Sequence, residues 1–443
     1  MTTTIEDLPV VVIGAGPIGL AAAAHLQERG VEVRVLERGA TSGAAVGEWG
    51  HVRLFSPWSE LIDPAARRLL ERGGWQAPRR TRYPTGREWV DAYLRPLGEA
   101  LGCVSTDADV VAVTREDRDR LVTSGRARSA FVVRVRRPDG VEVVRARAVV
   151  EASGTWTTPN PLGADGIPAI GEEVHADRIL HRMPDLRDDR VRGRYAGRHV
   201  VVAGTGASAK GTLIALASLA EQHPATRVTW LVRRARIGAA FGGSGRDELS
   251  ERGALGEQAR RAVEQSAITP VLGFRAARVL AADGHLVVES SDGERIDEVD
   301  EIIALTGFRP DLSHLTELRL DLDPVLQAPR LLAPLIDPNE HSCGTVEPHG
   351  ARELEQPEPG FYVTGMASYG RASSFLALTG FEQVRSVAAA IAGDHAAAAK
   401  VELTLPDTGV CGGAGDFDAP NADGVGCCGA APTVLDLRLS APR

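Results

Sequence analysis

Two glycine-rich turns, far apart in the chain, have the residue types and spacing of dinucleotide-binding turns. Gly14, Gly16 and Gly19 follow one apolar run, and Gly204 and Gly206 follow another. Glycines in such turns let the backbone approach a pyrophosphate, and the N-terminus of the following helix offers oriented N–H groups and a positive dipole. Because one turn binds one dinucleotide, we expect two bound dinucleotides and electron transfer between a nicotinamide and a flavin.

The residues that follow the first turn complete the pattern. A helix is expected from Pro17, and a strand over residues 31–36 leads to Glu37 and Arg38. An acid about 20 residues beyond the glycines is placed to accept hydrogen bonds from a ribose hydroxyl. The order strand, turn, helix, strand and acid is much more specific than the glycines alone.

The second turn leads to a different strand end. Ser208 lies at the start of the expected helix, and the strand over residues 227–232 ends in Arg233 and Arg234. A basic pair at this position favours a ribose 2′-phosphate, and therefore NADP(H) over NAD(H). The alternative is that the two arginines are only exposed charge at a strand end.

The composition argues against several other classes of protein. The 443 residues carry a net charge of −9, and 43% of them are hydrophobic and 25% charged, as in ordinary globular proteins. We find no basic stripe typical of nucleic-acid binding and no apolar run long enough to cross a membrane. The polar N-terminus lacks the features of a signal peptide, and five cysteines in such a chain suggest a reducing, cytoplasmic location.

The order of the expected elements predicts an α/β fold with two Rossmann-like dinucleotide-binding domains, each with a small β-meander. Residues 1–160 and 300–400 are expected to form the first domain, and residues 161–299 the second domain, inserted into it. Residues 401–443 are rich in Gly, Ala, Asp and Cys and are expected to form an irregular tail. The two halves share one element order, which indicates an internal duplication.

Over roughly residues 8–395 the chain resembles the flavin-containing monooxygenase branch of the two-dinucleotide-binding flavoproteins. Besides the glycine turns, the resemblance rests on Gly47-Glu48-Trp49, Tyr83-Pro84, Leu305-Thr306-Gly307-Phe308-Arg309-Pro310 and Gly360-Phe361-Tyr362-Val363-Thr364-Gly365. Of the branch's Phe-x-Gly-x-x-x-His-x-x-x-Trp sequence the chain keeps Gly171 and His175. The resemblance implies that residues 1–160 and 300–400 bind FAD and that residues 161–299 bind NADPH.

The motifs and the resemblance together give a set of expected cofactor-binding residues. They are Gly14, Gly16, Pro17, Gly19, Glu37, Arg38, Trp49, Gly154, Gly204, Gly206, Ser208, Arg233, Arg234, Gly307, Gly365, Met366 and Arg371. Met366 stands where many relatives carry an acid. Trp49 is expected to pack near the flavin ring, with a generic core position as the alternative. For Arg371, contact with the flavin phosphate or ring competes with simple solvation at a helix end.

A closer resemblance is to the flavoproteins of actinobacterial arsenic-resistance operons. It rests on the amino-acid sequences of residues 48–58, 341–346 and 366–371. These relatives look like NADPH-dependent flavin monooxygenases that act on arsenic compounds. The resemblance therefore implies a small-molecule substrate with a soft nucleophilic atom.

The implied reaction is an oxygen transfer. NADPH passes a hydride to FAD, reduced flavin adds O₂, and a C4a-(hydro)peroxyflavin transfers one oxygen to a soft heteroatom such as S, Se or As. Such atoms carry their own lone pair, so no general base is required. The alternative is an NADPH-linked flavin reductase that acts on a thiol-bound soft ion or a partner protein, and a third reading is a cofactor-binding sensor without turnover. A homodimer is common for such folds.

Two side chains are candidates for direct contact with the substrate. Arg53 is expected to face the flavin pyrimidine or the substrate, with a solvated loop arginine as the alternative. Cys343 lies in a loop between two expected flavin-proximal motifs, where it either contacts the substrate or simply packs.

The remaining cysteines suggest a soft-ion site. Cys427 and Cys428 are adjacent, and such pairs suit capture of a soft ion because a disulfide between neighbours is strained. Together with Cys411 or Cys343 they would offer a third thiolate to trivalent arsenic or Hg²⁺. The alternative is that the pair is incidental in a glycine-rich tail.

Overall fold

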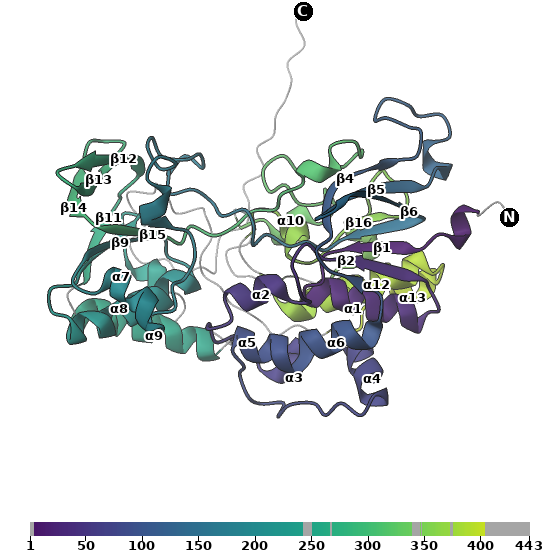
Figure 1. Ribbon diagram of the computed structural model, residues 1–443, viewed down its shortest axis with the longest axis horizontal. Helices are drawn as coiled ribbons and strands as arrows, with labels where there is room; N and C mark the ends of the chain where they lie inside the picture. Colours follow the sequence, from purple (N-terminus) through teal and green to yellow (C-terminus); the bar gives the residue numbers. More distant parts are fainter. Residues whose placement is uncertain are drawn as a thin grey trace, which may run out of the picture.

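The computed structural model describes the following residues: 4–241, 250–265, 268–338, 346, 348–372 and 375–403. In this part of the chain two α/β units lie side by side (Figure 1). The first unit holds both the N-terminal residues and the segment from α10 to α13, and the second unit is formed by the middle of the chain. The α/β fold with two Rossmann-like units is confirmed.

The first unit is built on a parallel sheet. Its strand order is β16 (Phe361–Val363), β7 (Ala148–Glu151), β1 (Val10–Ile13), β2 (Val33–Leu36) and β3 (Val104–Ser105). The helices of this unit are α1 (Pro17–Glu28), α2 (Ala44–Glu48), α3 (Trp58–Leu61), α4 (Pro64–Arg72), α5 (Gly86–Trp89), α6 (Arg95–Leu101), α10 (Ala333–Ile336), α11 (Ala351–Leu354), α12 (Ala377–Ile391) and α13 (His395–Ala399). A π-helical turn at Val90–Leu94 joins α5 to α6.

The second unit repeats this plan on its own parallel sheet. Its strand order is β11 (Ile268–Leu272), β10 (Arg227–Val232), β9 (His199–Ala203), β15 (Glu301–Ala304) and β8 (Ile179–Leu180). The helices are α7 (Asp189–Tyr195), α8 (Ala207–Gln222) and α9 (Ser250–Gln265). Because β15 pairs with β9, this sheet runs past residue 299, where the sequence had placed the end of the second domain.

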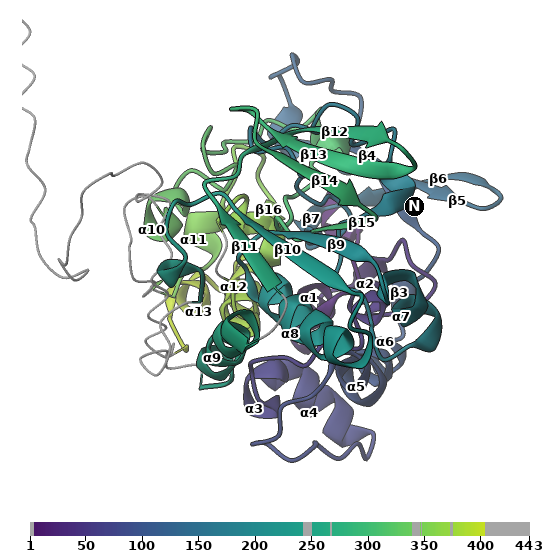
Figure 2. The ribbon, with the colours of Figure 1, turned by 90° about the vertical axis from the view of Figure 1, so that its left-hand side faces the viewer.

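Each unit also carries an antiparallel meander, as expected. The first is β4 (Asp109–Arg115), β5 (Phe131–Arg137) and β6 (Gly140–Ala146). The second is β12 (Ala276–Ala282), β13 (His285–Ser290) and β14 (Arg295–Val299). Figure 2 shows β12–β14 on one side of the second sheet and α8 and α9 on the other.

The central strands carry unbroken apolar runs, Val10–Ile13 in β1 and residues 200–203 in β9, because both of their faces are covered. Val10 and Val12 pack in the same core as the helices, whereas Val11 and Ile13 pack against the first meander. In the second unit, β9 alternates in the same way between α8 and the second meander. Side chains in a strand alternate between the faces of a sheet, so an unbroken apolar run is what such a three-layer unit requires.

Two crossings of the described chain join the units, and they are hydrogen bonded to each other. The Asn160 N–H donates to the Gly307 carbonyl at 2.9 Å, and the Arg309 N–H donates to the Thr158 carbonyl at 3.0 Å. Pro159 and Phe308 form the antiparallel bridge between these bonds. We call residues 158–160 and 307–309 the connector ribbon.

A buried ionic cluster holds the first unit together away from the glycine turns. Glu358 accepts from Arg115 Nε at 3.1 Å and from Arg126 Nε at 2.8 Å, and it also accepts from the Arg319 N–H at 3.0 Å. Arg115 lies over the ring of Phe131, 3.6 Å from its centroid. Burial alone would raise the pKa of Glu358, but the hydrogen bonds and charges of the two arginines and the Arg319 N–H hold it below its usual value of 4.5.

We predict that Glu358→Gln lowers the free energy of unfolding by roughly 3–5 kcal/mol near neutral pH, because Arg115 and Arg126 then stay buried without a carboxylate. Urea denaturation measures this effect. A carboxyl with a depressed pKa stabilises the fold above its unfolded pKa, and that contribution is lost as the pH falls through the folded value. The difference between variant and wild type should therefore shrink in acid. Glu116→Gln, which removes the exposed partner of Arg145, is the control and should cost at most about 1 kcal/mol.

Candidate functional site

One continuous cavity of 1440 Å³ extends across both units. It is larger than the roughly 300–1,000 Å³ of typical single-ligand pockets, so it has room for more than one. Its lining includes these residues expected from the sequence: Gly14, Gly16, Pro17, Glu37, Arg38, Trp49, Arg53, Gly154, Gly204, Gly206, Ser208, Arg233, Arg234, Gly307, Gly365, Met366 and Arg371. Gly19 does not line the cavity.

The first glycine turn is shaped by close backbone contacts. Gly14 has φ +98°, and a Cβ there would lie 2.7 Å from the carbonyl oxygen of Ala152. Gly19 packs behind the turn, where a Cβ would lie 1.9 Å from the Gly14 carbonyl oxygen. A Cβ at Gly16, in contrast, would meet no atom within 4 Å. Gly16 therefore leaves the N-terminus of α1 open to the cavity.

The second glycine turn has the same geometry. Gly204 has φ +119°, and a Cβ there would lie 2.2 Å from the carbonyl oxygen of Leu305. Gly206, like Gly16, would meet no atom within 4 Å. The turn opens α8, whose first-turn residues Ser208 and Lys210 both line the cavity.

The acid after the first turn is held in place by backbone N–H groups. Glu37 accepts from the Ala15 N–H and from the Gly39 N–H, each at 2.7 Å. These bonds fix the carboxylate at the end of β2. A carboxylate has about four lone-pair sites, so Glu37 keeps the capacity to accept from a ligand hydroxyl.

Five cationic side chains from the described residues of the second unit line the cavity: Arg182, Lys210, Arg233, Arg234 and Arg252. Arg233 and Arg234 follow β10 as expected, whereas the other three were not singled out from the sequence. Burial, and then the charge of Arg234, lower the pKa of the Arg233 guanidinium. Crowded like charges of this kind favour an anionic ligand.

Trp49 and Arg53, which line the cavity in the first unit, are each held by a close contact. A Cβ at Gly86 would lie 2.8 Å from the Trp49 ring, so Trp49 packs closely on the start of α5. Arg53 is exposed, and its Nη1 donates to the Tyr83 carbonyl at 2.7 Å. Arg53 is therefore anchored in its loop while it lines the cavity.

The segment after β16 forms another wall of the cavity. The Gly365 N–H donates to the buried amide oxygen of Gln383 at 2.7 Å, and Met366 follows on the cavity lining. Arg371 Nε donates to Gln327 Oε1 at 3.0 Å. Both residues after Gly365 that the sequence singled out therefore reach the cavity.

A buried ion pair at the cavity edge was not expected from the sequence. His314 Nε2 lies 2.8 Å from Glu151 Oε2, and His314 lines the cavity. Burial opposes the charge on His314, but the hydrogen bond and charge of Glu151, with Asp311 and Asp109, raise its pKa. The only sequence signal was an acid at the end of the apolar run 148–151.

The candidate thiols are not placed by the structure. Cys343, Cys411, Cys427 and Cys428 lie outside the described residues. Within the described residues Cys103 is a half-buried free thiol, and burial raises its pKa. No group of three His, Cys, Asp or Glu residues suited to a metal ion occurs in the part of the chain that the structure describes.

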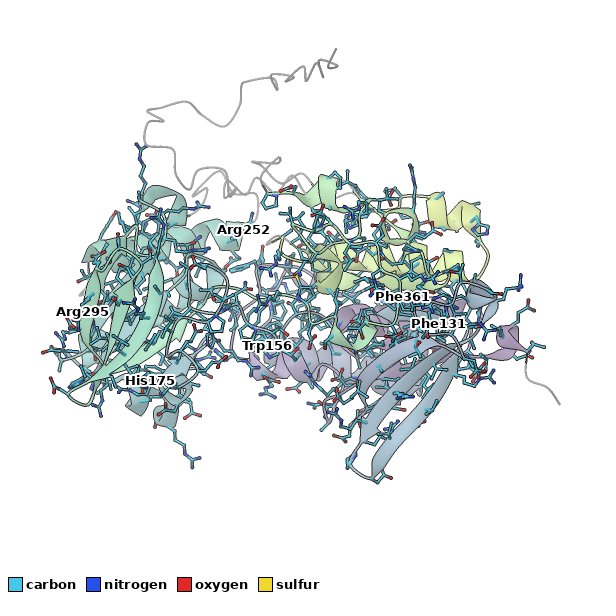
Figure 3. All side chains as sticks on the ribbon, turned by 90° about the horizontal axis from the view of Figure 1, so that it is seen from above. Phe131, Trp156, His175, Arg252, Arg295 and Phe361 are labelled. Carbon is cyan, nitrogen blue, oxygen red and sulfur yellow. The ribbon has the colours of Figure 1, made fainter. Side chains whose placement is uncertain are left out.

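Two further expectations concern His175 and membrane-spanning helices. His175 of the partly kept family sequence lies in the second unit and does not line the cavity (Figure 3). Among the described residues, no helix has both the length and the apolar character needed to span a bilayer.

The repeated turn, helix and meander around a shared cavity define an oxidoreductase with two dinucleotide-binding units. A family model described as pyridine nucleotide-disulphide oxidoreductase matches residues 11–330, and the chain belongs to this family. The sequence-based expectation of an oxidoreductase is thus confirmed.

Curated relatives include both monooxygenases and reductases. The chain is 29% identical to a flavin-containing monooxygenase of Arabidopsis thaliana, described as FMO GS-OX-like 2, over 50% of each chain. It is 28% identical to a ferredoxin–NADP reductase of Saccharopolyspora erythraea over 55% of this chain and 59% of the relative. The matches thus span little more than half the length of these relatives.

Solved structures share the fold at low sequence identity. Bacillithiol disulfide reductase from Bacillus cereus has a TM-score of 0.63 and 22% identity, with 87% of this chain and 99% of that chain covered. Ornithine N-hydroxylase from Kutzneria sp. 744, solved with reduced FAD, NADP⁺ and L-ornithine, has a TM-score of 0.55 and 18% identity, with coverages of 88% and 99%. FAD and NADP(H), the cofactors expected from the sequence, are thus the pair held by a protein of this fold.

We predict that Gly16→Ala and Gly206→Ala leave the free energy of unfolding near that of the wild type, because the new Cβ meets no protein atom. Each methyl group enters the cavity at a helix N-terminus and should weaken binding of one dinucleotide at least about tenfold. Calorimetric titration with NADP⁺ tests Gly206→Ala, and flavin retention during purification tests Gly16→Ala.

Two other glycines serve as comparisons for this experiment. Gly193→Ala in α7 also meets nothing within 4 Å, but it does not line the cavity, so both binding properties should stay unchanged. Gly204→Ala should instead destabilise the fold, since its φ is positive and its Cβ would overlap the Leu305 carbonyl. Equal affinity of the wild type and Gly206→Ala for NADP⁺ would contradict the assignment of the second glycine turn to dinucleotide binding.

Proposed function

We propose that the chain is an NADPH-dependent FAD monooxygenase that transfers one oxygen atom of O₂ to a soft heteroatom of a small molecule. The observation that carries the proposal is the single cavity that joins the two glycine turns. The five cysteines of the sequence include no C-x-x-C or C-x-x-x-x-C pair of the kind that takes electrons from a flavin, which favours O₂ as the acceptor.

FAD would lie along the first unit, formed by residues 1–160 and by the chain from the end of β15 to about residue 400. When bound, this group accepts a hydride from NADPH and delivers electrons to O₂. Gly14, Gly16 and the N-terminus of α1 would hold its pyrophosphate, and Glu37 would accept from its ribose. Trp49, Gly154, Gly307, Met366 and Arg371 would then surround the remaining part of the molecule.

NADPH would lie along the second unit, formed by the chain from residue 161 to the end of β15 at Ala304. Gly204, Gly206 and Ser208 at the start of α8 would hold its pyrophosphate. Arg233 and Arg234 would bind the 2′-phosphate through charge-assisted hydrogen bonds. The two ligands would enter the cavity from opposite units and so bring their reactive ends together.

The substrate needs little more from the protein than position and exclusion of water. Arg53, anchored on the Tyr83 carbonyl, is the described side chain that we assign to substrate or flavin contact. An arsenic compound is one small molecule with a soft heteroatom, and the resemblance of residues 48–58 to the arsenic-operon flavoproteins supports it as the substrate. The roles of Cys343 and of the thiols Cys411, Cys427 and Cys428 stay predictions, as do a homodimer and a cytoplasmic location.

A second candidate is an NADPH-linked flavin reductase acting on a thiol-bound soft ion or a partner protein. It is supported by the family, whose description includes disulphide reduction, and by the fold shared with bacillithiol disulfide reductase. The two candidates differ in where the electrons of NADPH go.

We predict that the purified yellow protein incorporates label from isotope-labelled O₂ into an oxidised thioether or trivalent arsenical while it consumes NADPH. Mass spectrometry of the product measures the incorporation. A reaction that proceeds without O₂ and yields a reduced product would replace this proposal by the reductase. A folded protein without flavin would overturn both.

We predict that Arg233→Ser with Arg234→Ser lowers the ratio of kcat/KM for NADPH to that for NADH by about tenfold or more, because bonds to a charged phosphate are lost. Steady-state NADPH and NADH oxidation give the ratio. Arg227→Gln, at the opposite end of β10 and paired with Glu298, is the matched control. An unchanged ratio in the double variant would return the pair to ordinary surface charge.

A further inference from the structure

The two crossings between the units each contribute an aromatic ring to one stack. Trp156 precedes the first strand of the connector ribbon, and Phe308 lies within the second strand. Their ring centroids are 4.8 Å apart with an interplanar angle of 32°. Trp156 lies between the two units (Figure 3).

A half-exposed ion pair closes over this stack. The indole N–H of Trp156 donates to Glu48 Oε2 at 2.9 Å, and Arg182 Nη1 donates to the same oxygen. The guanidinium of Arg182 also lies over the Trp156 ring, 4.8 Å from its centroid. Glu48 ends α2 in the first unit, whereas Arg182 follows β8 in the second unit.

A second contact joins the same two segments a few residues further on. Arg187 Nη2 donates to the carbonyl of His51 at 2.9 Å, and Asp185 holds the Arg187 guanidinium at 2.9 Å. Residues 48–51 of the first unit therefore run against residues 182–187 of the second.

These side chains border the space between the two proposed ligands. Trp156, Arg182, Met183 and Phe308 all line the cavity that joins the glycine turns. Any change in the angle between the units at the connector ribbon therefore alters the distance between the ends of the cavity.

We propose that Glu48, Trp156 and Arg182 form an interdomain clamp whose residues are positioning residues for hydride transfer. The clamp holds the units at the angle that brings the nicotinamide and the flavin together, and this role rests on the proposed function. Hydride transfer needs the reacting atoms about 3–3.5 Å apart, and a misplacement of about 1 Å costs on the order of 100-fold in rate. A small rotation about the ribbon is therefore enough to matter.

The test uses the full-length protein with its flavin and the variants Glu48→Gln, Arg182→Gln and their combination. Hydrogen–deuterium exchange reports the clamp directly: the amides of Asn160 and Arg309 should exchange up to about fivefold faster in each variant, the most that an exposed ion pair allows, while those of β1 and β9 stay protected. In anaerobic stopped flow, the limiting rate of flavin reduction by NADPH should fall by up to about fivefold with little change in NADP⁺ affinity.

The variant combination and salt separate a clamp from two unrelated contacts. Because Glu48 and Arg182 act through one bond, the double variant should be no slower than the slower single variant. Both side chains are nearly half exposed, so rising NaCl should slow the wild type towards the variants and leave the variants unaffected. Glu116→Gln removes an equally exposed ion pair within the first unit and should change neither measurement.

The outcomes for the clamp and for the proposed function are distinct. Wild-type exchange at Asn160 and Arg309 and a wild-type reduction rate in Glu48→Gln would overturn the clamp, as would equal effects in Glu116→Gln. A wild type that binds no flavin or does not oxidise NADPH would overturn the proposed function instead. In that case the exchange measurement still shows whether the three residues hold the units together.

Discussion

The structure depends on a close contact of backbone with backbone at each glycine turn. At Gly14 a Cβ would overlap the carbonyl of Ala152, and at Gly204 it would overlap the carbonyl of Leu305. Ala152 directly follows β7 and Leu305 directly follows β15. The first glycine of each turn thus packs against the end of a neighbouring strand, two residues before the glycine that leaves the helix N-terminus open to the cavity.

The same two strand ends lead into the crossings between the units. The chain after Ala152 reaches Trp156 and the first strand of the connector ribbon, and the chain after Leu305 reaches its second strand. The internal duplication therefore has a structural consequence beyond two similar folds. The strand that packs against each glycine turn leads, within a few residues, into the connector ribbon between the two units.

The two glycine turns could be predicted from local sequence patterns. The ion pairs between residues far apart in the chain could not. An apolar run, a glycine turn and a terminal Glu37 or Arg233 lie within one β-α-β unit, so their spacing carries the information. The pair of Glu48 and Arg182 joins positions 134 residues apart, and Glu151 and His314 are 163 residues apart. A single sequence gives no signal that such residues meet.

Two other features were missed for reasons of pattern. Helix α9 is rich in charged residues, so its sequence has no clear apolar periodicity from which to predict it. The sequence boundary at residue 299 falls just before β15, because a strand of four residues carries no local signal of the sheet it joins. Only its pairing with β9 assigns it to the second unit.

The ionic contacts inside the first unit and between the two units differ in burial, and therefore in strength. Glu358 is buried between two arginines inside the first unit, where removing one charge from such a cluster costs several kcal/mol. The Glu48–Arg182 pair is nearly half exposed, and pairs of that kind contribute about 1 kcal/mol or less. Thermal motion can open a contact of that size much more readily than the buried cluster around Glu358. An ionic contact that opens easily therefore lies at the connector ribbon, where a small displacement changes the distance between the two proposed ligands.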